Sequence, residues 1–184
     1  MLVLASQSPR RRELLERAGI AFTVRIADID ETVRLGEAPQ QYVRRLAAQK
    51  AMAVSRSAEE CVLAADTTVV LDGEILGKPE DAADAKRMLQ ALAGRSHEVV
   101  TGICLRYRQD LFIDAAVTSV EVCPMTEADI DAYVASGEPM DKAGAYGIQG
   151  IYSRYISGIE GCYFNVVGLP VSLVCRYLRK MKLL

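Results

Sequence analysis

The sequence of 184 residues contains no tryptophan and only one histidine, His97. One imidazole cannot build a zinc centre that needs several histidine ligands, so that class of site is excluded. A Ser-His-Asp hydrolase finds little support either, because the sequence also lacks a G-x-S-x-G motif. We therefore expect any acid–base chemistry to rest on carboxylates and lysines.

The chain also lacks a large excess of charge of either sign. Lysine and arginine total 22 against 24 aspartates and glutamates, a formal net charge of -2. No global basic field is available to hold a nucleic-acid backbone, although a local basic patch stays open. The sequence has no basic region ahead of its first apolar residues and no apolar run near the ~20 residues that a membrane span needs. We expect a soluble, cytoplasmic protein with no stable nucleic-acid partner and no membrane partner.

The five cysteines are an odd number, are widely spaced and include no C-x-x-C pair. This spacing fits neither a disulfide framework nor a zinc knuckle, and it predicts buried free thiols in a reducing compartment. No G-x-x-x-x-G-K-[ST] motif is present, which excludes an ordinary P-loop, and no G-x-G-x-x-G opens a helix. A dinucleotide-binding fold is therefore unsupported.

Length and composition indicate one globular domain spanning residues 1–184, with 51% apolar and 25% charged residues. Strands are expected at 2–5, 22–26, 61–65, 67–71, 74–76, 98–107 and 111–122, and helices at 9–18, 40–56, 82–92, 127–135 and 170–181. The stretch 141–161 looks irregular. Because Asp72-Gly73 predicts a hairpin among helical crossovers, we expect an α/β (mixed α+β) fold with a mixed sheet.

The segment Ser8-Pro9-Arg10-Arg11-Arg12 breaks a local rule. Ser8 is a good N-cap and Pro9 suits the first helical position, yet three cations follow at the positive end of the helix dipole. One interpretation is a solvated basic turn. The other is a polyanion site, where backbone N–H groups, serine hydroxyls and guanidinium groups converge on phosphate oxygens.

Lys50 extends an apolar stripe formed by Val43, Leu46 and Ala47 on one helix face. Its stem could extend along the edge of the core with its ammonium in water. Otherwise it points into a polar cleft and pairs with a carboxylate or a phosphate, because an unpaired buried ammonium is costly.

Asp66-Thr67 follows an apolar run and precedes the hairpin, so we expect the Asp66 carboxylate to project from the end of a strand, where sites in α/β proteins are commonly built. A turn-forming aspartate is the alternative. Asp28, Asp30 and Glu31 form an acidic group in a loop. This group is solvated if it stands alone, but near Asp66 it could hold Mg²⁺.

Two further segments attract attention. Gly77-Lys78-Pro79 places a lysine in a rigid stretch after the hairpin, and residues 141–150 contain three glycines within seven positions. Glycines at this density indicate a backbone that turns sharply or approaches a ligand closely.

In order and spacing, these motifs resemble the Maf family of nucleoside triphosphate pyrophosphatases along essentially the whole chain. The matching segments are Ala5-Ser6-Gln7-Ser8-Pro9-Arg10-Arg11, Asp30-Glu31, Lys50, Ala65-Asp66-Thr67, Gly77-Lys78-Pro79, 97–102, 141–150 and 165–170. Gln7 is a minor departure, since many relatives have a small residue there. Arg10, Thr67 and Gln149 look like the branch of the family that acts on dTTP and UTP.

The resemblance implies cleavage of a nucleoside triphosphate between the α- and β-phosphates by an inosine triphosphatase-like fold. In that fold an elongated mixed sheet is flanked by helices, and the substrate lies in a cleft between two lobes. Asp66 would be the proton acceptor, with Lys50 and Lys78 as catalytic lysines. Ser6, Ser8, Arg10, Arg11, Thr67 and Gln149 would bind or select the substrate. A divalent cation, Mg²⁺ or Mn²⁺, would be held by Glu31, Asp66 and Asp30.

Three alternatives and one property stay open at this point. The family has been connected with septum formation and division arrest, so a regulatory binding protein is an alternative to the enzyme. The sister branch acts on 7-methyl-GTP and differs in the late glycine-rich segment. A nucleic-acid-binding module built on Ser8-Pro9-Arg10-Arg11-Arg12 is disfavoured by the net charge and by the few aromatic residues. A homodimer stays open as the oligomeric state.

Overall fold

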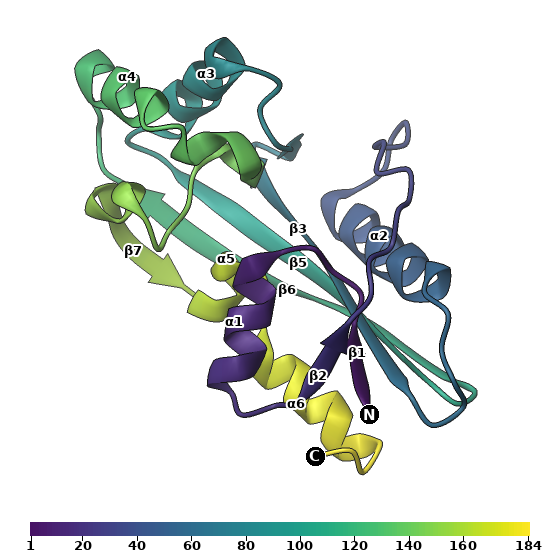
Figure 1. The fold of residues 1–184 in the computed structure, drawn as a ribbon. Helices are drawn as coiled ribbons and strands as arrows, with labels where there is room; N and C mark the ends of the chain where they lie inside the picture. The colour runs from purple at the N-terminus through teal and green to yellow at the C-terminus, as the bar shows by residue number, and fades with distance from the viewer. The chain divides into compact units, whose positions relative to one another are not determined.

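The structure is a computed structural model that describes all 184 residues, and the chain divides into two compact units. Unit 1 comprises residues 1–67, 101–116 and 168–184, and unit 2 comprises 68–100 and 117–167. Seven strands form one hydrogen-bonded sheet in the order β2-β1-β3-β5-β6-β7, with β4 paired to β3 (Figure 1). Three of them contribute residues to both units: β3 (Cys61–Leu71), β5 (Ser96–Tyr107) and β6 (Asp110–Val122).

Unit 1 is built around the buried strand β1 (Leu2–Leu4), which pairs in parallel with both β2 (Phe22–Val24) and β3. Parallel neighbours require a crossover, and α1 (Pro9–Arg17) supplies it between β1 and β2. The other helices of this unit are α2 (Pro39–Ala53) and α6 (Val171–Lys180).

Helix α2 packs very closely on the sheet of unit 1. Its residues Ala47 and Ala51 join a buried cluster with small residues such as Ala5, which follows β1, and Ala64 of β3. At Gly102 in β5, an added Cβ would lie 2.5 Å from the carbonyl carbon of Val43 in α2. Glycine is therefore required there by the backbone of the helix, and this contact fixes the height of α2 above β3 and β5.

Unit 2 contains the hairpin and the later helices. The strand β4 (Glu74–Leu76) pairs antiparallel with β3 through a turn in which Asp72 and Gly73 have φ of 52° and 84°. Helix α3 (Ala82–Leu92) buries residues at i, i+3, i+4 and i+7 and contacts α4 (Glu127–Ala135). The chain then forms η1 (Glu138–Asp141), η2 (Ala143–Ala145), η3 (Ile151–Tyr155), β7 (Ile156–Glu160) and α5 (Tyr163–Val167).

The structure confirms the mixed α/β class and most of the expected elements, with two corrections. The expected break between strands at Asp66 is absent, because β3 runs unbroken from Cys61 to Leu71. Part of the stretch expected to be irregular forms β7, which pairs antiparallel with β6. The single domain and the cleft between two lobes stay predictions.

Two expectations from composition can also be compared with the structure. All five cysteines are free; Cys61 and Cys104 are buried, whereas Cys123, Cys162 and Cys175 are partly exposed. No helix combines the length and the apolar character that crossing a membrane requires.

Candidate active site

Asp66 lies in the middle of β3 and is only 8% exposed. The expectation of an aspartate at a strand end was wrong, and so was the alternative of a turn-forming aspartate, because the backbone continues as strand for five more residues, to Leu71. Almost all the other residues of β3 are also buried, so the Asp66 carboxylate loses most of its hydration. Such a group needs a partner.

That partner is Lys50, which reaches Asp66 from helix α2. The Lys50 Nζ donates to Asp66 Oδ1 at 2.6 Å and also lies 2.7 Å from Glu31 Oε1. The three preceding residues of the stripe, Val43, Leu46 and Ala47, are fully buried, so the helix directs the lysine at the sheet. The alternative of a lysine extending into water is wrong, and the predicted pairing with a carboxylate is confirmed.

Burial raises the pKa of Asp66 above the usual range of a carboxyl group, while Lys50 and Arg11 act in the opposite direction. The balance of these influences makes the carboxylate a stronger base than a solvated aspartate. A stronger base is better suited to accept a proton from water.

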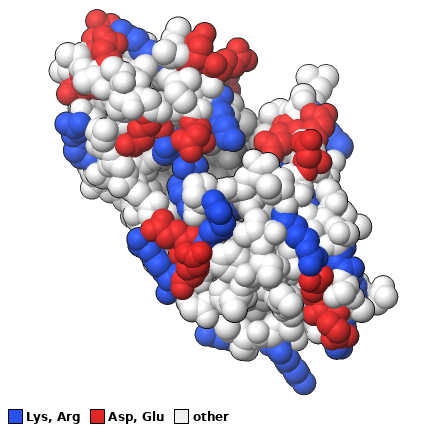
Figure 2. Space-filling model, in the orientation of Figure 1, with Lys and Arg blue, Asp and Glu red and all other residues white.

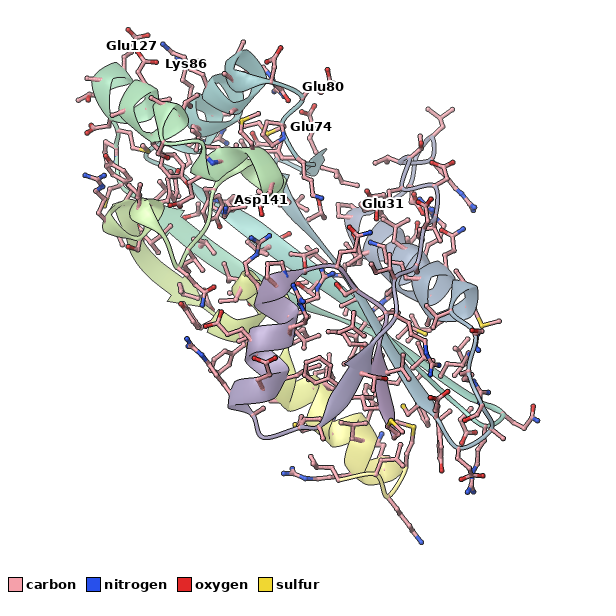
Figure 3. All side chains as sticks on the ribbon, in the orientation of Figure 1. Glu31, Glu74, Glu80, Lys86, Glu127 and Asp141 are labelled. Carbon is pink, nitrogen blue, oxygen red and sulfur yellow. The ribbon has the colours of Figure 1, made fainter.

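Glu31 lies on the loop that precedes α2, as labelled in Figure 3, and the helix holds this loop in place. The Tyr42 hydroxyl donates to the backbone carbonyl of Glu31 at 3.0 Å. Arg45 donates to the carbonyl of Thr32 and forms two hydrogen bonds with the Glu37 carboxylate. Burial raises the pKa of Tyr42 to about 12, so its hydroxyl keeps the proton that it donates.

Asp30 is placed differently from its neighbour. Its Oδ1 accepts hydrogen bonds from the backbone N–H and the hydroxyl of Thr32, at 2.9 and 2.6 Å. The structure therefore brings Glu31 and Asp66 together on Lys50, whereas the Asp30 carboxylate closes its own turn. No group of three or more acidic, histidine or cysteine side chains forms a ready-made metal cluster.

The donor set at Lys50 nevertheless fits a magnesium-type cation. Two carboxylates, Asp66 and Glu31, converge on one positive charge, the Lys50 ammonium. Mg²⁺ commonly binds through one or two carboxylates, with substrate phosphates and water completing its shell. Two protein carboxylates are thus enough for such a cation when other ligands complete its shell.

The turn between β1 and α1 is organised by Arg11, which is buried. Its Nε donates to the carbonyl of Gly168 at 2.8 Å, its Nη1 to Ser6 Oγ at 3.2 Å and its Nη2 to Thr67 Oγ1 at 3.0 Å. Burial lowers the pKa of Arg11, with the Asp66 charge opposing this effect. These contacts give Arg11 a structural task, joining three segments of unit 1, and its role as a substrate ligand stays a prediction.

The cap of α1 departs from the expectation. Ser8 occupies the N-cap position and Pro9 the first turn, but the Ser8 side chain makes no capping hydrogen bond. The Ser8 N–H instead donates to Ser6 Oγ at 3.2 Å. The first turn contains no acidic residue, and Arg10, only partly exposed, belongs to it. A helix start of this kind suits an anion.

Thr67 adjoins Asp66 and is partly exposed. Its hydroxyl accepts from Arg11 and lies 2.9 Å from the hydroxyl of Thr101 in β5. Thr101 is fully buried and was not among the expected site residues. A hydroxyl within the otherwise apolar run 99–105 was the only indication of it in the sequence.

Lys78 and Gln149 belong to unit 2, and both are exposed. Their loops meet, because the N–H of Gly144 donates to the carbonyl of Gly77 at 3.0 Å. The structure thus brings Lys78 close to the glycine-rich segment that carries Gln149. The other predicted residues all belong to unit 1: Ser6, Ser8, Arg10, Arg11, Asp30, Glu31, Lys50, Asp66 and Thr67.

The fold is that of a mixed α/β protein in which two carboxylates, Asp66 and Glu31, pair with one lysine. Among solved structures, the Ham1 protein of Staphylococcus aureus is similar, with a TM-score of 0.54 at 16% identity and 98% of each chain covered. At that identity the likeness concerns the fold alone. Residues 1–181 match the family described as Maf-like protein, and the chain belongs to the Maf family.

Individual relatives are much more similar in sequence. A protein of Anaeromyxobacter sp. strain Fw109-5 named dTTP/UTP pyrophosphatase is 54% identical over 184 residues, covering 97% of this chain and 88% of that protein. A protein of Koribacter versatilis with the same name is 49% identical over 180 residues, covering 97% and 93%. The family resemblance expected from the motifs is therefore confirmed.

Proposed function

We propose that this chain hydrolyses dTTP and UTP to the nucleoside monophosphate and pyrophosphate. The observation that carries the proposal is the buried Asp66 carboxylate, held by Lys50 opposite Glu31. The names of relatives about half identical over nearly the whole chain agree with this activity and with its two substrates.

In the proposed reaction, Asp66 accepts a proton from a water molecule, and the water oxygen attacks the α-phosphorus. The bond between that phosphorus and the oxygen bridging to the β-phosphate breaks, and pyrophosphate leaves with the bridging oxygen. Lys50 orients the carboxylate through its 2.6 Å hydrogen bond and adds positive charge near the phosphates.

A divalent cation, Mg²⁺ or Mn²⁺, would be held by Asp66 and Glu31. When bound, it supplies positive charge that stabilises the developing negative charge on the phosphate oxygens. Asp30 is a weaker candidate, because its carboxylate is hydrogen-bonded to Thr32.

The remaining predicted residues divide into two groups. Ser6, Ser8, Arg10, Arg11 and Lys78 would bind the phosphates, and Thr67 and Gln149 would select the base. An amide side chain can donate to a carbonyl of thymine or uracil and accept from the imide N–H, which makes Gln149 suitable. The homodimer and the cytoplasmic location stay predictions.

The test is a panel of nucleoside triphosphates with Mg²⁺ or Mn²⁺, in which pyrophosphate and orthophosphate are measured separately. We expect pyrophosphate as the first product, with dTTP and UTP turned over faster than CTP, GTP and 7-methyl-GTP. Orthophosphate as the first product would contradict the cleavage position. Preference for 7-methyl-GTP would instead place the chain's activity in the sister branch.

A further inference from the structure

Glu138, the first residue of η1, is a partly buried carboxylate in unit 2 with both of its oxygens engaged. The Tyr133 hydroxyl donates to Glu138 Oε1 at 2.9 Å, and the backbone N–H of Ile151 donates to Oε2 at 3.0 Å. The same Tyr133 hydroxyl accepts from the N–H of Gly147 at 3.2 Å. Glu138 and Tyr133 together therefore hold the backbone at Gly147 and at Ile151.

These two points bracket a tight turn that carries Gln149. The N–H of Gly150 donates to the carbonyl of Gly147 at 3.2 Å, which makes residues 147–150 a β-turn with Gln149 at its third position. Ile148 is buried, whereas Gln149 is exposed. The amide of Gln149 thus stands on a backbone that is fixed on both sides.

The glycines of this turn are explained by the same side chains. A Cβ at Gly150 would overlap the Glu138 carboxylate, and a Cβ at Gly147 would lie 2.7 Å from Lys142 Cε. Lys142 in turn donates from Nζ to the carbonyl of Glu138 at 2.6 Å, which holds the backbone that carries the carboxylate. The close approach that the glycines permit is therefore to Glu138 and Lys142 of the same unit.

The hydroxyl of Tyr133 stays protonated in this arrangement and therefore remains a hydrogen-bond donor. Burial raises the pKa of Tyr133, and the hydrogen bond to Glu138 acts in the same direction. The hydroxyl keeps its proton, so it can donate to Glu138 while accepting from Gly147.

We propose that Glu138 is a positioning residue for base selection, which fixes the Gln149 turn so that its amide meets the pyrimidine in one orientation. This inference rests on the proposed function, in which Gln149 distinguishes uracil from cytosine. An amide can discriminate between two bases only if its donor and acceptor are held in register with the ring. A turn that is free to move lets the amide adapt to either base, so selectivity falls before turnover does.

The experiment compares kcat/KM for UTP and CTP in the wild type, Glu138→Ala, Glu138→Gln and Tyr133→Phe, with the thermal unfolding midpoint of each. The matched control is Glu127→Gln. Glu127 is exposed at the start of α4, and in Figure 3 it lies well apart from Asp141, the last residue of η1. We expect the UTP-to-CTP ratio to fall about tenfold in Glu138→Ala, a size consistent with misplacing a recognition group. Glu138→Gln keeps an acceptor for the N–H of Ile151. The UTP-to-CTP ratios of Glu138→Gln and Tyr133→Phe should therefore lie between those of Glu138→Ala and the control.

A merely structural role for Glu138 would lower the unfolding midpoint or slow both nucleotides by the same factor, with the ratio unchanged; that result overturns the inference. If Glu138→Ala does not fold, the ratios of Glu138→Gln and Tyr133→Phe decide in the same way. Gln149→Ala separates the positioning role of Glu138 from the base selection by Gln149. A ratio that collapses in Gln149→Ala but not in the folded Glu138 variants refutes only the positioning role, whereas a wild-type ratio near one refutes the proposed base preference as well.

Discussion

Asp66 combines two properties that solvated aspartates lack, namely burial within a strand and a hydrogen bond from an ammonium at 2.6 Å. The substitution Asp66→Asn keeps the size of the side chain and removes the basic oxygen. We expect kcat to fall by about 10²–10⁴-fold, the usual contribution of a positioned general base, while the protein still folds. Steady-state pyrophosphate release and a thermal melt of the same sample measure both effects.

The control for this variant is Asp110→Asn, which changes an exposed carboxylate at the start of β6 in the same unit. It should retain wild-type activity. An Asp66→Asn protein with more than about a tenth of the wild-type kcat would contradict the assignment. Titration with Mn²⁺ separates the two roles of Asp66, because unchanged metal affinity with lost turnover supports the role of base.

Lys50 should serve every accepted nucleotide equally, because it contacts carboxylates and no base-reading group. In Lys50→Ala we expect kcat/KM for dTTP, UTP and CTP to fall by similar factors. The free energy of unfolding should also fall by about 1–3 kcal/mol, because the variant leaves a buried carboxylate without its hydrogen bond. Normalised kcat/KM values that stay at the wild-type level would show that the ion pair is structural only.

Residues such as Lys50 and Arg11 show how far sequence reasoning reaches at this scale. The interrupted apolar stripe of α2 left two alternatives for Lys50, an ammonium in water or one paired with a carboxylate or a phosphate, and the structure shows the pairing with a carboxylate. For Arg11 the sequence predicted only a cation near an anion site. Its acceptors come from residues 6, 67 and 168, and no local pattern reveals that such distant segments meet.

Among the elements, α2 lies so close to the sheet that Gly102 of β5 has no room for a Cβ against the Val43 carbonyl. Gly102→Ala should push the helix outwards and lower the free energy of unfolding by about 1–3 kcal/mol, as overpacking typically does. It should also lower kcat, because Lys50 is carried on the same helix. Gly77→Ala is the control for stability, since an added Cβ there meets nothing within 4 Å and its φ is not positive. Equal unfolding free energies in the two variants would contradict this packing argument.

Two ion pairs make the stability of unit 1 depend on acid pH. Hydrogen bonds from Arg25 lower the pKa of Glu60 to about 2, and hydrogen bonds from Arg45 lower that of Glu37 to about 2, from an ordinary value of 4.5. Carboxyl groups with depressed values contribute stability that is fully present above pH 4.5 and is lost as the pH falls towards 2. Urea unfolding at pH 6 and at pH 3 should show this loss in the wild type and a smaller loss in the double variant Glu37→Gln, Glu60→Gln. An identical loss in both proteins would assign the acid sensitivity to other groups.

The elements that sequence reasoning misplaced share a physical cause. Asp66 is polar, so a period-2 pattern divides at that point, although the strand continues because Lys50 satisfies the carboxylate from another element. Strand β7 contains a glycine and has little buried surface, and it exists because it pairs with β6. Long-range pairing of this kind has no local signature.

For the molecule as a whole, the net charge of -2 and the distribution of charge argue against nucleic-acid binding. Blue and red side chains are interspersed over the face shown in Figure 2. We expect no retention of duplex DNA in an electrophoretic shift assay at ~150 mM salt, where a protein must neutralise several phosphates to bind. Binding that falls steeply as salt increases would contradict this expectation and favour a basic site at the start of α1.

At this scale the sequence predicted the alternation of strands and helices, and therefore the fold class, from periodicity and turn residues. The residue patterns themselves did not predict a division into two units; only the family resemblance implied two lobes. No linker, repeat or change of composition marks three of the four boundaries, because these fall inside β3, β5 and β6; the fourth lies between Val167, the last residue of α5, and Gly168. A boundary within a strand leaves no Gly-rich or Pro-rich segment for sequence reasoning to find.

Unit 1 is assembled from three separate stretches of chain, and this arrangement has a consequence for biosynthesis. Its last stretch, residues 168–184, supplies the Gly168 carbonyl that Arg11 binds, 157 positions away in the sequence. On the ribosome, the segments of unit 2 emerge completely before unit 1 can close around Arg11. Contacts between such distant residues slow folding, so the nascent amino-terminal segment stays incompletely folded until residues 168–184 have been synthesised and have emerged.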